Sequence, residues 1–142
     1  MATDVVGVGV DIVHLRRFHA ALTRSPRLVA RVFTDREVAL SGGASLRVSS
    51  LAARWAAKEA VAKVLVDNRG LEWHHCEIVT GPFGEPSVLL TGTVLAAARR
   101  RGIGSWHLSL SHDGEMAIAF VVASSGAGKT SETSETSGAS ET

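Results

Sequence analysis

A lone carboxylate stands in an apolar segment near the start of the chain. Asp11 is the only charged residue within 5–13, whose letters are VVGVGVDIV. Burying a bare carboxylate is costly, so we expect Asp11 to be paired, to cap a helix or to bind a cation. The residues alone leave two alternatives open: Asp11 caps the helix expected from about Leu15, or it binds a cation.

A second carboxylate lies in the middle of the chain. Glu59 falls within 50–66, SLAARWAAKEAVAKVLV, with Lys63 one helical turn later. The plain interpretation is an exposed Glu–Lys pair worth about 0.2–0.5 kcal/mol. Small residues on the same face, Ala52 and Ala56, would instead let another chain or a ligand approach. Brought together, Glu59 and Asp11 would form a hard-oxygen site for Mg²⁺, which typically uses one or two carboxylates plus substrate phosphates.

A polar run near the end of the folded part is the third candidate. Residues 109–113 read SLSHD, and their serines share one expected strand face with His107. We expect His112 and Asp113 at the tip of a hairpin, in a turn over 112–114. A catalytic Ser-His-Asp triad is excluded, because triads assemble from distant positions. A polar strand face followed by a turn remains the plain alternative.

A fourth segment resembles a nucleotide-binding P-loop and is treated as a decoy. Residues 123–130 read ASSGAGKT, without the leading glycine, and SETSETSGASET follows. That continuation cannot pack as the amphipathic helix whose N-terminus would face the phosphates. We therefore predict a disordered Ser/Thr/Glu/Gly tail over 124–142, after one domain over 1–123.

The elements that would position these residues alternate between strand and helix periodicity. We expect a second helix opened by Pro26 with Ser25 as its cap, and a third opened by the capping box T-D-R-E at 34–37. Strands are expected at 5–13, 76–80, 87–90, 106–111 and 116–123, and further helices at 15–22, 50–66 and 93–101. The prediction is an α+β fold in which one antiparallel sheet wraps the long alanine-rich helix.

Composition narrows the function classes. The 142 residues suit one domain, and a net charge of +1 from 15 basic and 14 acidic side chains gives no argument for nucleic acid. No apolar run reaches the length of a membrane span. The acidic, non-basic N-terminal stretch does not resemble a signal peptide. Single Cys76 excludes an internal disulfide and fits a reducing compartment, so we expect a cytoplasmic protein.

Three segments in this order together resemble one enzyme family. They are GVGVDIV at 7–13, RWAAKEA at 54–60 and SLSHD at 109–113, supported by Arg17, Phe18 and the G-E-P of 84–86. This set resembles the holo-(acyl-carrier-protein) synthases, small 4′-phosphopantetheinyl transferases, over about residues 4–123. Each motif alone is modest, whereas the ordered set is specific.

The resemblance implies a reaction and a metal. Asp11 and Glu59 would be ligands of Mg²⁺, and the enzyme would move 4′-phosphopantetheine from coenzyme A to a serine of an apo-acyl carrier protein. Adenosine 3′,5′-bisphosphate would leave, with its charge stabilised by the metal. The serine proton would pass to a metal-bound water or to Glu59, and the resemblance leaves both open. It also leaves open a carrier from fatty-acid, polyketide or peptide synthesis.

The resemblance further implies roles for other residues. Lys63 and His112 would join Asp11 and Glu59 in the catalytic group. The family forms homotrimers with the active site between neighbouring subunits. The implied coenzyme A contacts are Arg54, Lys58, Lys63, Gly84, Pro86, Ser111, His112 and Asp113. The implied contacts with the acidic carrier protein are Arg16, Arg17, Arg24 and Arg27.

Some positions depart from the family pattern. His14 stands where many members carry glutamate, and Glu85 replaces the lysine of G-K-P. The long helix ends in V-D-N-R-G at 66–70 rather than in a glycine-rich turn, with Arg69 as a candidate replacement for phosphate contacts. An inactive docking protein of the same fold is the alternative function. The intact set of proposed metal and coenzyme A residues argues against it.

Overall fold

The computed structural model describes residues 3–126, and the P-loop-like segment and the predicted tail lie almost entirely outside that part. The strands are β1 (Val5–His14), β2 (Cys76–Thr80), β3 (Pro86–Leu90), β4 (Ser105–Asp113) and β5 (Met116–Ser124). The helices are α1 (Leu15–Arg24), α2 (Leu28–Val32), α3 (Asp35–Leu40), α4 (Val48–Leu65) and α5 (Gly92–Arg100), with short 3₁₀ turns η1 (Gly43–Ser45) and η2 (Trp73–His75). Within residues 3–126, no helix has the length and apolar character needed to span a bilayer.

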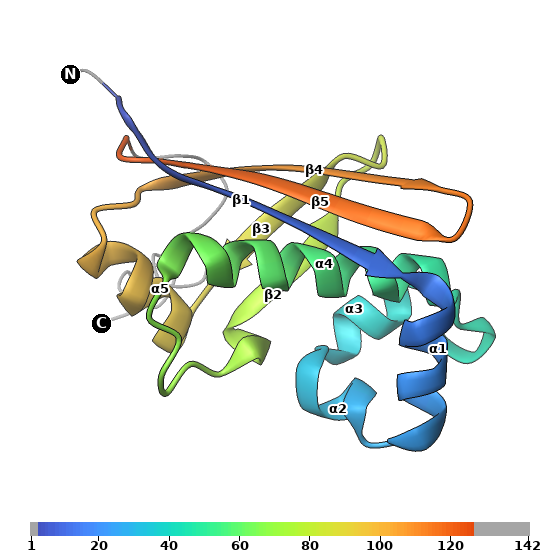
Figure 1. Ribbon diagram of the computed structural model, residues 1–142. Helices are drawn as coiled ribbons and strands as arrows, with labels where there is room; N and C mark the ends of the chain where they lie inside the picture. The colour runs from blue at the N-terminus through green and yellow to red at the C-terminus, as the bar shows by residue number, and fades with distance from the viewer. Residues whose placement is uncertain (1–2, 127–142) are drawn as a thin grey trace.

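The strands form two antiparallel sheets against α4. Three strands pair in the order β1-β5-β4, and β2 pairs only with β3. Figure 1 shows α4 lying along one side of the three-stranded sheet, with the β2–β3 hairpin passing beside the same helix. The predicted α+β fold around the long helix is confirmed. The expectation of a single sheet is wrong, because the central hairpin makes no ladder with the other strands.

Helix α4 is buried on nearly all sides, which explains its many alanines. One side packs under β1 and β5, and the other meets the central hairpin, so small side chains are needed around the whole circumference. Leu51, Ala52 and Ala56 accordingly have no exposed surface. Among the charged residues of the helix, Arg54 and Lys58 are buried, whereas Glu59 is half-buried and Lys63 is exposed.

Two predicted boundaries differ from the structure. His112 pairs with Ala117 and Asp113 pairs with Met116, so both residues end β4 instead of forming the turn. The turn is only two residues long because Gly114 takes a positive φ of 56°, which suits glycine. Helix α2 begins at Leu28, and Ser25 does not cap it with its side chain.

The predicted capping box at α3 is confirmed and does more than cap. The Thr34 hydroxyl accepts from the Glu37 amide at 3.1 Å, and the Glu37 carboxylate accepts from the Thr34 amide at 2.9 Å. The same carboxylate is fully buried and accepts from the Ile78 amide of β2 at 2.8 Å. Glu37 therefore ties the start of α3 to the central hairpin.

Strand β1 lies unusually close to α4 because glycines face the helix. A side chain at Gly9 would overlap the carbonyl oxygen of Ala60, and one at Gly7 would meet Val64 Cγ1 at 3.1 Å. Glycine in a strand often marks such a close approach of another backbone. Since β1 residues alternate, Gly7, Gly9 and Asp11 point toward the helix, whereas Val8, Val10 and Ile12 point away.

This contact predicts that Gly9→Ala lowers the free energy of unfolding by about 1–3 kcal/mol, because a backbone carbonyl cannot move aside easily. The matched control is Gly7→Ala, whose new methyl group meets a side chain that can shift. Urea denaturation of both variants measures the difference. Equal stability of Gly9→Ala and the unaltered protein would show that the β1–α4 contact is looser than described.

Candidate active site

Asp11 faces α4 and is paired with a lysine. Its Oδ1 accepts from Lys63 Nζ at 3.1 Å, and the same ammonium donates to the Val10 carbonyl at 2.8 Å. The interpretation of Asp11 as a helix cap is wrong, since α1 follows His14 and has no side-chain cap. The carboxylate is mostly buried, with 19% of its side chain exposed.

Glu59 lacks a partner of its own. Among the described residues its carboxylate makes no hydrogen bond or ion pair, because Lys63 turns to Asp11 instead. The expected surface pair between Glu59 and Lys63 is therefore wrong. Burial raises the pKa of Glu59, the nearby Asp11 carboxylate raises it further, and Lys63 partly offsets both. The two carboxylates thus lie close enough to repel, and the Lys63 ammonium is bonded to only one of them.

The two carboxylates line one cleft of about 410 Å³. Arg17 and Phe18 of α1 and Trp55 of α4 form other parts of its wall. Within residues 3–126, no group of three or more His, Cys, Asp or Glu side chains is placed to hold a metal ion. Two carboxylate ligands fit Mg²⁺ when a substrate and water supply the remaining oxygens.

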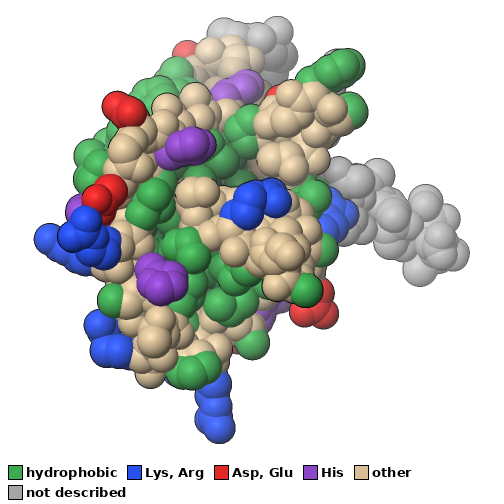
Figure 2. All heavy atoms as spheres, turned by 90° about the vertical axis from the view of Figure 1, so that its right-hand side faces the viewer, with side chains coloured by type: hydrophobic (Ala, Val, Ile, Leu, Met, Phe, Trp, Pro, Cys, Tyr) green, Lys and Arg blue, Asp and Glu red, His purple; other side chains and the backbone are tan. Residues whose placement is uncertain are grey.

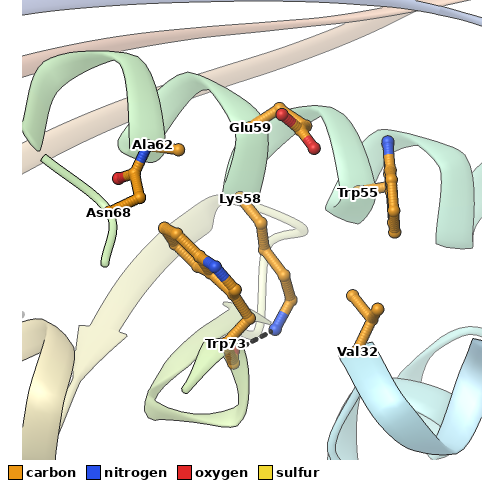
Figure 3. A pocket seen from close by; sticks show the side chains of 7 residues that line it. All are labelled: Val32, Trp55, Lys58, Glu59, Ala62, Asn68 and Trp73. Atoms are coloured by element: carbon orange, nitrogen blue, oxygen red, sulfur yellow. Dashed lines mark hydrogen bonds between the residues drawn. The ribbon is translucent and has the colours of Figure 1, made fainter. Parts of the chain in front are cut away.

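A second cleft, of about 270 Å³, opens on the other side of Glu59 (Figure 3). The indoles of Trp55 and Trp73 flank it, and Ala62 of α4 and Val32 of α2 also line it. Sequence reasoning missed this cleft, because Trp73 lies in a short 3₁₀ turn that no periodicity marks. The cleft adds an apolar wall next to the carboxylate pair.

Lys58 forms the inner side of that second cleft but is fully engaged. Its ammonium donates to the carbonyls of Trp73 at 2.9 Å and Cys76 at 2.6 Å and pairs with Glu37 Oε1 at 2.9 Å. An ammonium has three donors, so none remains for a phosphate. The side chain also lies 5.6 Å from the Phe33 ring centroid. This environment favours a structural role over the coenzyme A contact that the resemblance implied.

Arg54 lines a third cleft, of about 250 Å³, at the start of α4. The guanidinium is 4% exposed and donates to Ile78 O at 3.0 Å and to Ser50 Oγ at 2.7 Å, but its Nη2 has no partner. Burial lowers the pKa of Arg54, and Glu37 partly offsets this. The polar residues around this cleft are Arg47, Ser49, Ser50, Arg54, Thr80, Ser111 and His112. With two arginines and several hydroxyls, this cationic cleft suits an anion.

His112 is not part of the Asp11–Glu59 cleft. It lines the cationic cleft and a neighbouring apolar one that also includes Asp113 and Ile12. In the sheet, Ala117 of β5 separates His112 of β4 from Val13 of β1, so these two backbones lie about 10 Å apart. The carboxylates and the cationic residues therefore lie in two separate clefts of one chain.

The remaining predicted contacts lie on exposed surfaces. Arg17 lines the carboxylate cleft, and Arg16 pairs with Glu115 at 2.7 Å. Arg24 and Arg27 are exposed beyond them. Figure 2 views the end of the molecule that carries α1, and basic side chains project from several parts of this face. The implied coenzyme A contacts in the central hairpin are Gly84, in the exposed turn, and Pro86, at the start of β3.

The end of α4 has an unusual backbone. Val66 has φ 69°, a conformation in which a β-branched residue is strained. The side chain of Arg69 pairs with Asp67 at 2.9 and 2.8 Å and holds the pKa of that carboxyl well below its usual range. Because Arg69 is paired with Asp67, its guanidinium is not free to contact a phosphate in this conformation.

Comparisons with known proteins agree on one family. A family model described as the 4′-phosphopantetheinyl transferase superfamily matches residues 7–121. A holo-[acyl-carrier-protein] synthase of Frankia casuarinae is 57% identical over 119 residues, covering 84% of this chain and 97% of the relative. The holo-ACP synthase structure from Plasmodium yoelii has a TM-score of 0.78 at 25% identity, covering 89% of this chain and 99% of that one. The Helicobacter pylori synthase in complex with coenzyme A has a TM-score of 0.72 at 28% identity, covering 82% and 99%.

The buried Lys58–Glu37 pair predicts a large loss of stability in Lys58→Met. Removing the ammonium leaves a fully buried carboxylate uncompensated, which costs about 3–5 kcal/mol. Lys63→Met on the same helix is the control, since Lys63 is exposed and its loss should cost about 1 kcal/mol or less. Chemical denaturation measures both. Similar values for the two variants would contradict the structural role of Lys58.

The raised pKa of Glu59 predicts how stability depends on pH. Folding favours the protonated carboxyl, so this group stabilises the fold most below the ordinary glutamate pKa. The contribution falls as pH rises through the raised folded value. We expect Glu59→Gln to be at least as stable as the unaltered protein at neutral pH, and to gain relative to it as pH rises from 4 (roughly the ordinary glutamate pKa). Thermal unfolding across pH tests this, and a destabilised variant at neutral pH would contradict it.

Proposed function

Because this chain belongs to the 4′-phosphopantetheinyl transferase superfamily and its relatives are holo-[acyl-carrier-protein] synthases, we propose how its own residues perform their reaction. The enzyme transfers 4′-phosphopantetheine from coenzyme A to a serine of apo-acyl carrier protein and releases adenosine 3′,5′-bisphosphate. The strongest support from the structure is one cleft lined by both Asp11 and Glu59. The apo-carrier serine would reach the diphosphate of coenzyme A at this cleft.

Asp11 and Glu59 would hold a Mg²⁺ ion. Glu59 has no other partner. Its burial and, after that, repulsion from the Asp11 carboxylate raise its pKa, so a bound divalent cation would offset an unfavourable negative charge. When bound, the ion would neutralise the diphosphate and stabilise the charge that develops on the leaving group. Lys63 is exposed on the same side and would turn from Asp11 toward the phosphates.

Either Glu59 or a water in the same cleft would take the proton of the carrier serine, the two acceptors that the family resemblance leaves open. Catalysis would otherwise depend on positioning and on charge stabilisation, as in other phosphoryl transfers. Arg17 lines the same cleft and, with Arg24 and Arg27, would meet the acidic surface of the carrier protein. Such charges set orientation and association rate more than affinity.

The cationic cleft would bind another phosphate of coenzyme A. Arg54 contributes its unpaired Nη2 donor, and Ser111 and His112 of β4 line the same cleft. This cleft and the carboxylate cleft are separate within one chain. A single coenzyme A would therefore contact the carboxylate cleft of one subunit and the cationic cleft of its neighbour. Asp113 lies at the end of β4 beside His112 and would have a minor part.

We propose that the subunits form a homotrimer through the three-stranded sheet. Its outward face exposes Val8, Val10 and Ile12 of β1 and Phe120 of β5, at 45–57% of their surface. No described helix covers this face (Figure 1). A contiguous apolar patch of this kind favours association with another protein surface. A cytoplasmic location is also proposed, supported by the free and buried Cys76.

The function is tested by incubating the protein with apo-acyl carrier protein, coenzyme A and Mg²⁺, and weighing the carrier by intact-mass spectrometry. We expect one added phosphopantetheine group, absent with EDTA. Asp11→Ala and Glu59→Ala should each slow transfer by about 10²–10³-fold, since a metal ion contributes several kcal/mol of charge stabilisation. Glu72→Ala, at an exposed carboxylate outside both clefts, is the control. Full activity of either cleft variant would refute the metal assignment.

The proposed trimer predicts that Val10→Asp yields smaller species. A charge in the centre of an apolar interface is costly to bury, whereas Ala96→Asp on the exposed side of α5 should leave the assembly unchanged. Light scattering at micromolar concentration measures the mass. A monomeric mass for the unaltered protein would contradict the trimer directly.

A further inference from the structure

Arg16 differs from the other arginines that the family resemblance assigned to the carrier protein. Its Nη2 donates to Glu115 Oε2 at 2.7 Å. In the described part of the chain, no ion pair holds Arg17, Arg24 or Arg27. One of the implied carrier contacts therefore meets an acid of its own chain before it can meet an acid of the carrier.

The backbone holds Glu115 beside the start of α1. Glu115 lies in the two-residue turn between β4 and β5, where Asp113 pairs with Met116. Its carbonyl oxygen accepts from the amide of Leu15, the first residue of α1, at 2.7 Å. This bond ties the tip of the hairpin to the helix through main-chain atoms. The fold thus presents the carboxylate to Arg16, and a substitution at position 115 can remove the charge while the turn keeps its place.

His14 faces the other oxygen of the same carboxylate. Its Nε2 lies 4.0 Å from Glu115 Oε1, whereas Arg16 is bonded to Oε2. Arg16 therefore lacks the two parallel bonds that make an arginine–carboxylate pair strong. Position 14 is also where many members of the family carry glutamate. A glutamate there would place a second negative charge next to Glu115.

The Arg16–Glu115 pair is exposed and can exchange. Of the two side chains, 78% of Arg16 and 51% of Glu115 are accessible. Exposed pairs of this kind contribute little to stability and are screened by salt. An arginine has five N–H donors, and Glu115 accepts only from Nη2. An acidic surface that approaches α1 can take over Arg16, but it must first displace Glu115.

We propose that Glu115 sets the affinity of this enzyme for the carrier protein, because it competes with the acidic surface of the carrier for Arg16. Glu115 acts through Arg16 and not on the reacting atoms, so it is a positioning residue. It lies outside both the carboxylate cleft and the cationic cleft, so its effect concerns the carrier and not coenzyme A. This inference rests on the proposed function, because that function makes the carrier protein the partner of α1.

Glu115→Gln removes the charge and keeps the shape of the side chain. Initial rates of transfer at low salt, with the apo-carrier varied, should show a carrier KM lower by about 2- to 5-fold, the range that an exposed ion pair supplies. We expect kcat and the KM for coenzyme A to stay unchanged. His14→Glu, which adds an acid beside Glu115, should raise the carrier KM. Glu72→Gln, at an exposed carboxylate outside both clefts, makes the same change in net charge and should have no effect.

A double-mutant comparison tests whether the effect passes through Arg16. Arg16→Gln alone should raise the carrier KM. Adding Glu115→Gln to that variant should change nothing further, because the competition has no arginine left to act on. The gain from Glu115→Gln alone should also shrink as salt is raised, since exposed charges are screened. A change in hairpin packing would persist at high salt.

An unchanged carrier KM in Glu115→Gln would overturn this role. An equal fall of the carrier KM with and without Arg16 would overturn it as well, since Glu115 would then act on the carrier directly. Calorimetry of apo-carrier binding to the same variants gives the comparison without turnover. Failure of transfer by the unaltered protein would therefore refute the proposed function alone, whereas normal transfer with equal carrier affinity in all variants would refute only the role of Glu115.

Discussion

The approach of the first strand to the long helix is the constraint on which the site depends. A glycine at position 9 lets the backbone of β1 contact the Ala60 carbonyl, a distance that no larger residue allows. Strand alternation then turns Asp11 toward the helix, where Glu59 and Lys63 occupy the adjacent turns. Small residues in both elements therefore set the separation of the two carboxylates, and the chemistry follows from that packing.

The molecule carries two kinds of charged pair, one buried and fully hydrogen-bonded and one facing a cleft. Glu37 and Lys58 are fully buried and use their hydrogen-bonding capacity on each other and on nearby backbone groups. Asp11 and Glu59 are partly buried and leave one carboxylate unpartnered beside another. A carboxylate that lines a cleft with a raised pKa and no protein partner is a candidate ligand-binding group. The Glu37–Lys58 pair ties α3 and β2 to α4, the helix that also carries Glu59.

Local patterns in the sequence were enough to predict the helices, most strand ranges and the carboxylates, because periodicity and capping act over a few residues. The role of Lys58 could not be read in this way. Its partners Glu37 and Cys76 lie 21 and 18 residues away, and only the folded chain brings them to the ammonium. The same holds for Glu59. Its helical spacing predicted a pair with Lys63, but in the folded chain Lys63 pairs with Asp11 of β1 instead. The end of β4 was predicted two residues too early, at Ser111 instead of Asp113, because the turn at Gly114 is only two residues long.

The most direct test of the central claim is a Mn²⁺ titration followed by electron paramagnetic resonance, with coenzyme A present. Mn²⁺ substitutes for Mg²⁺ at oxygen ligands and reports binding without turnover. The account predicts one bound ion per chain in the unaltered protein and a loss of affinity of at least about tenfold in both Asp11→Asn and Glu59→Gln. Unchanged Mn²⁺ binding in these two variants would contradict the assignment of the Asp11–Glu59 cleft as the metal site.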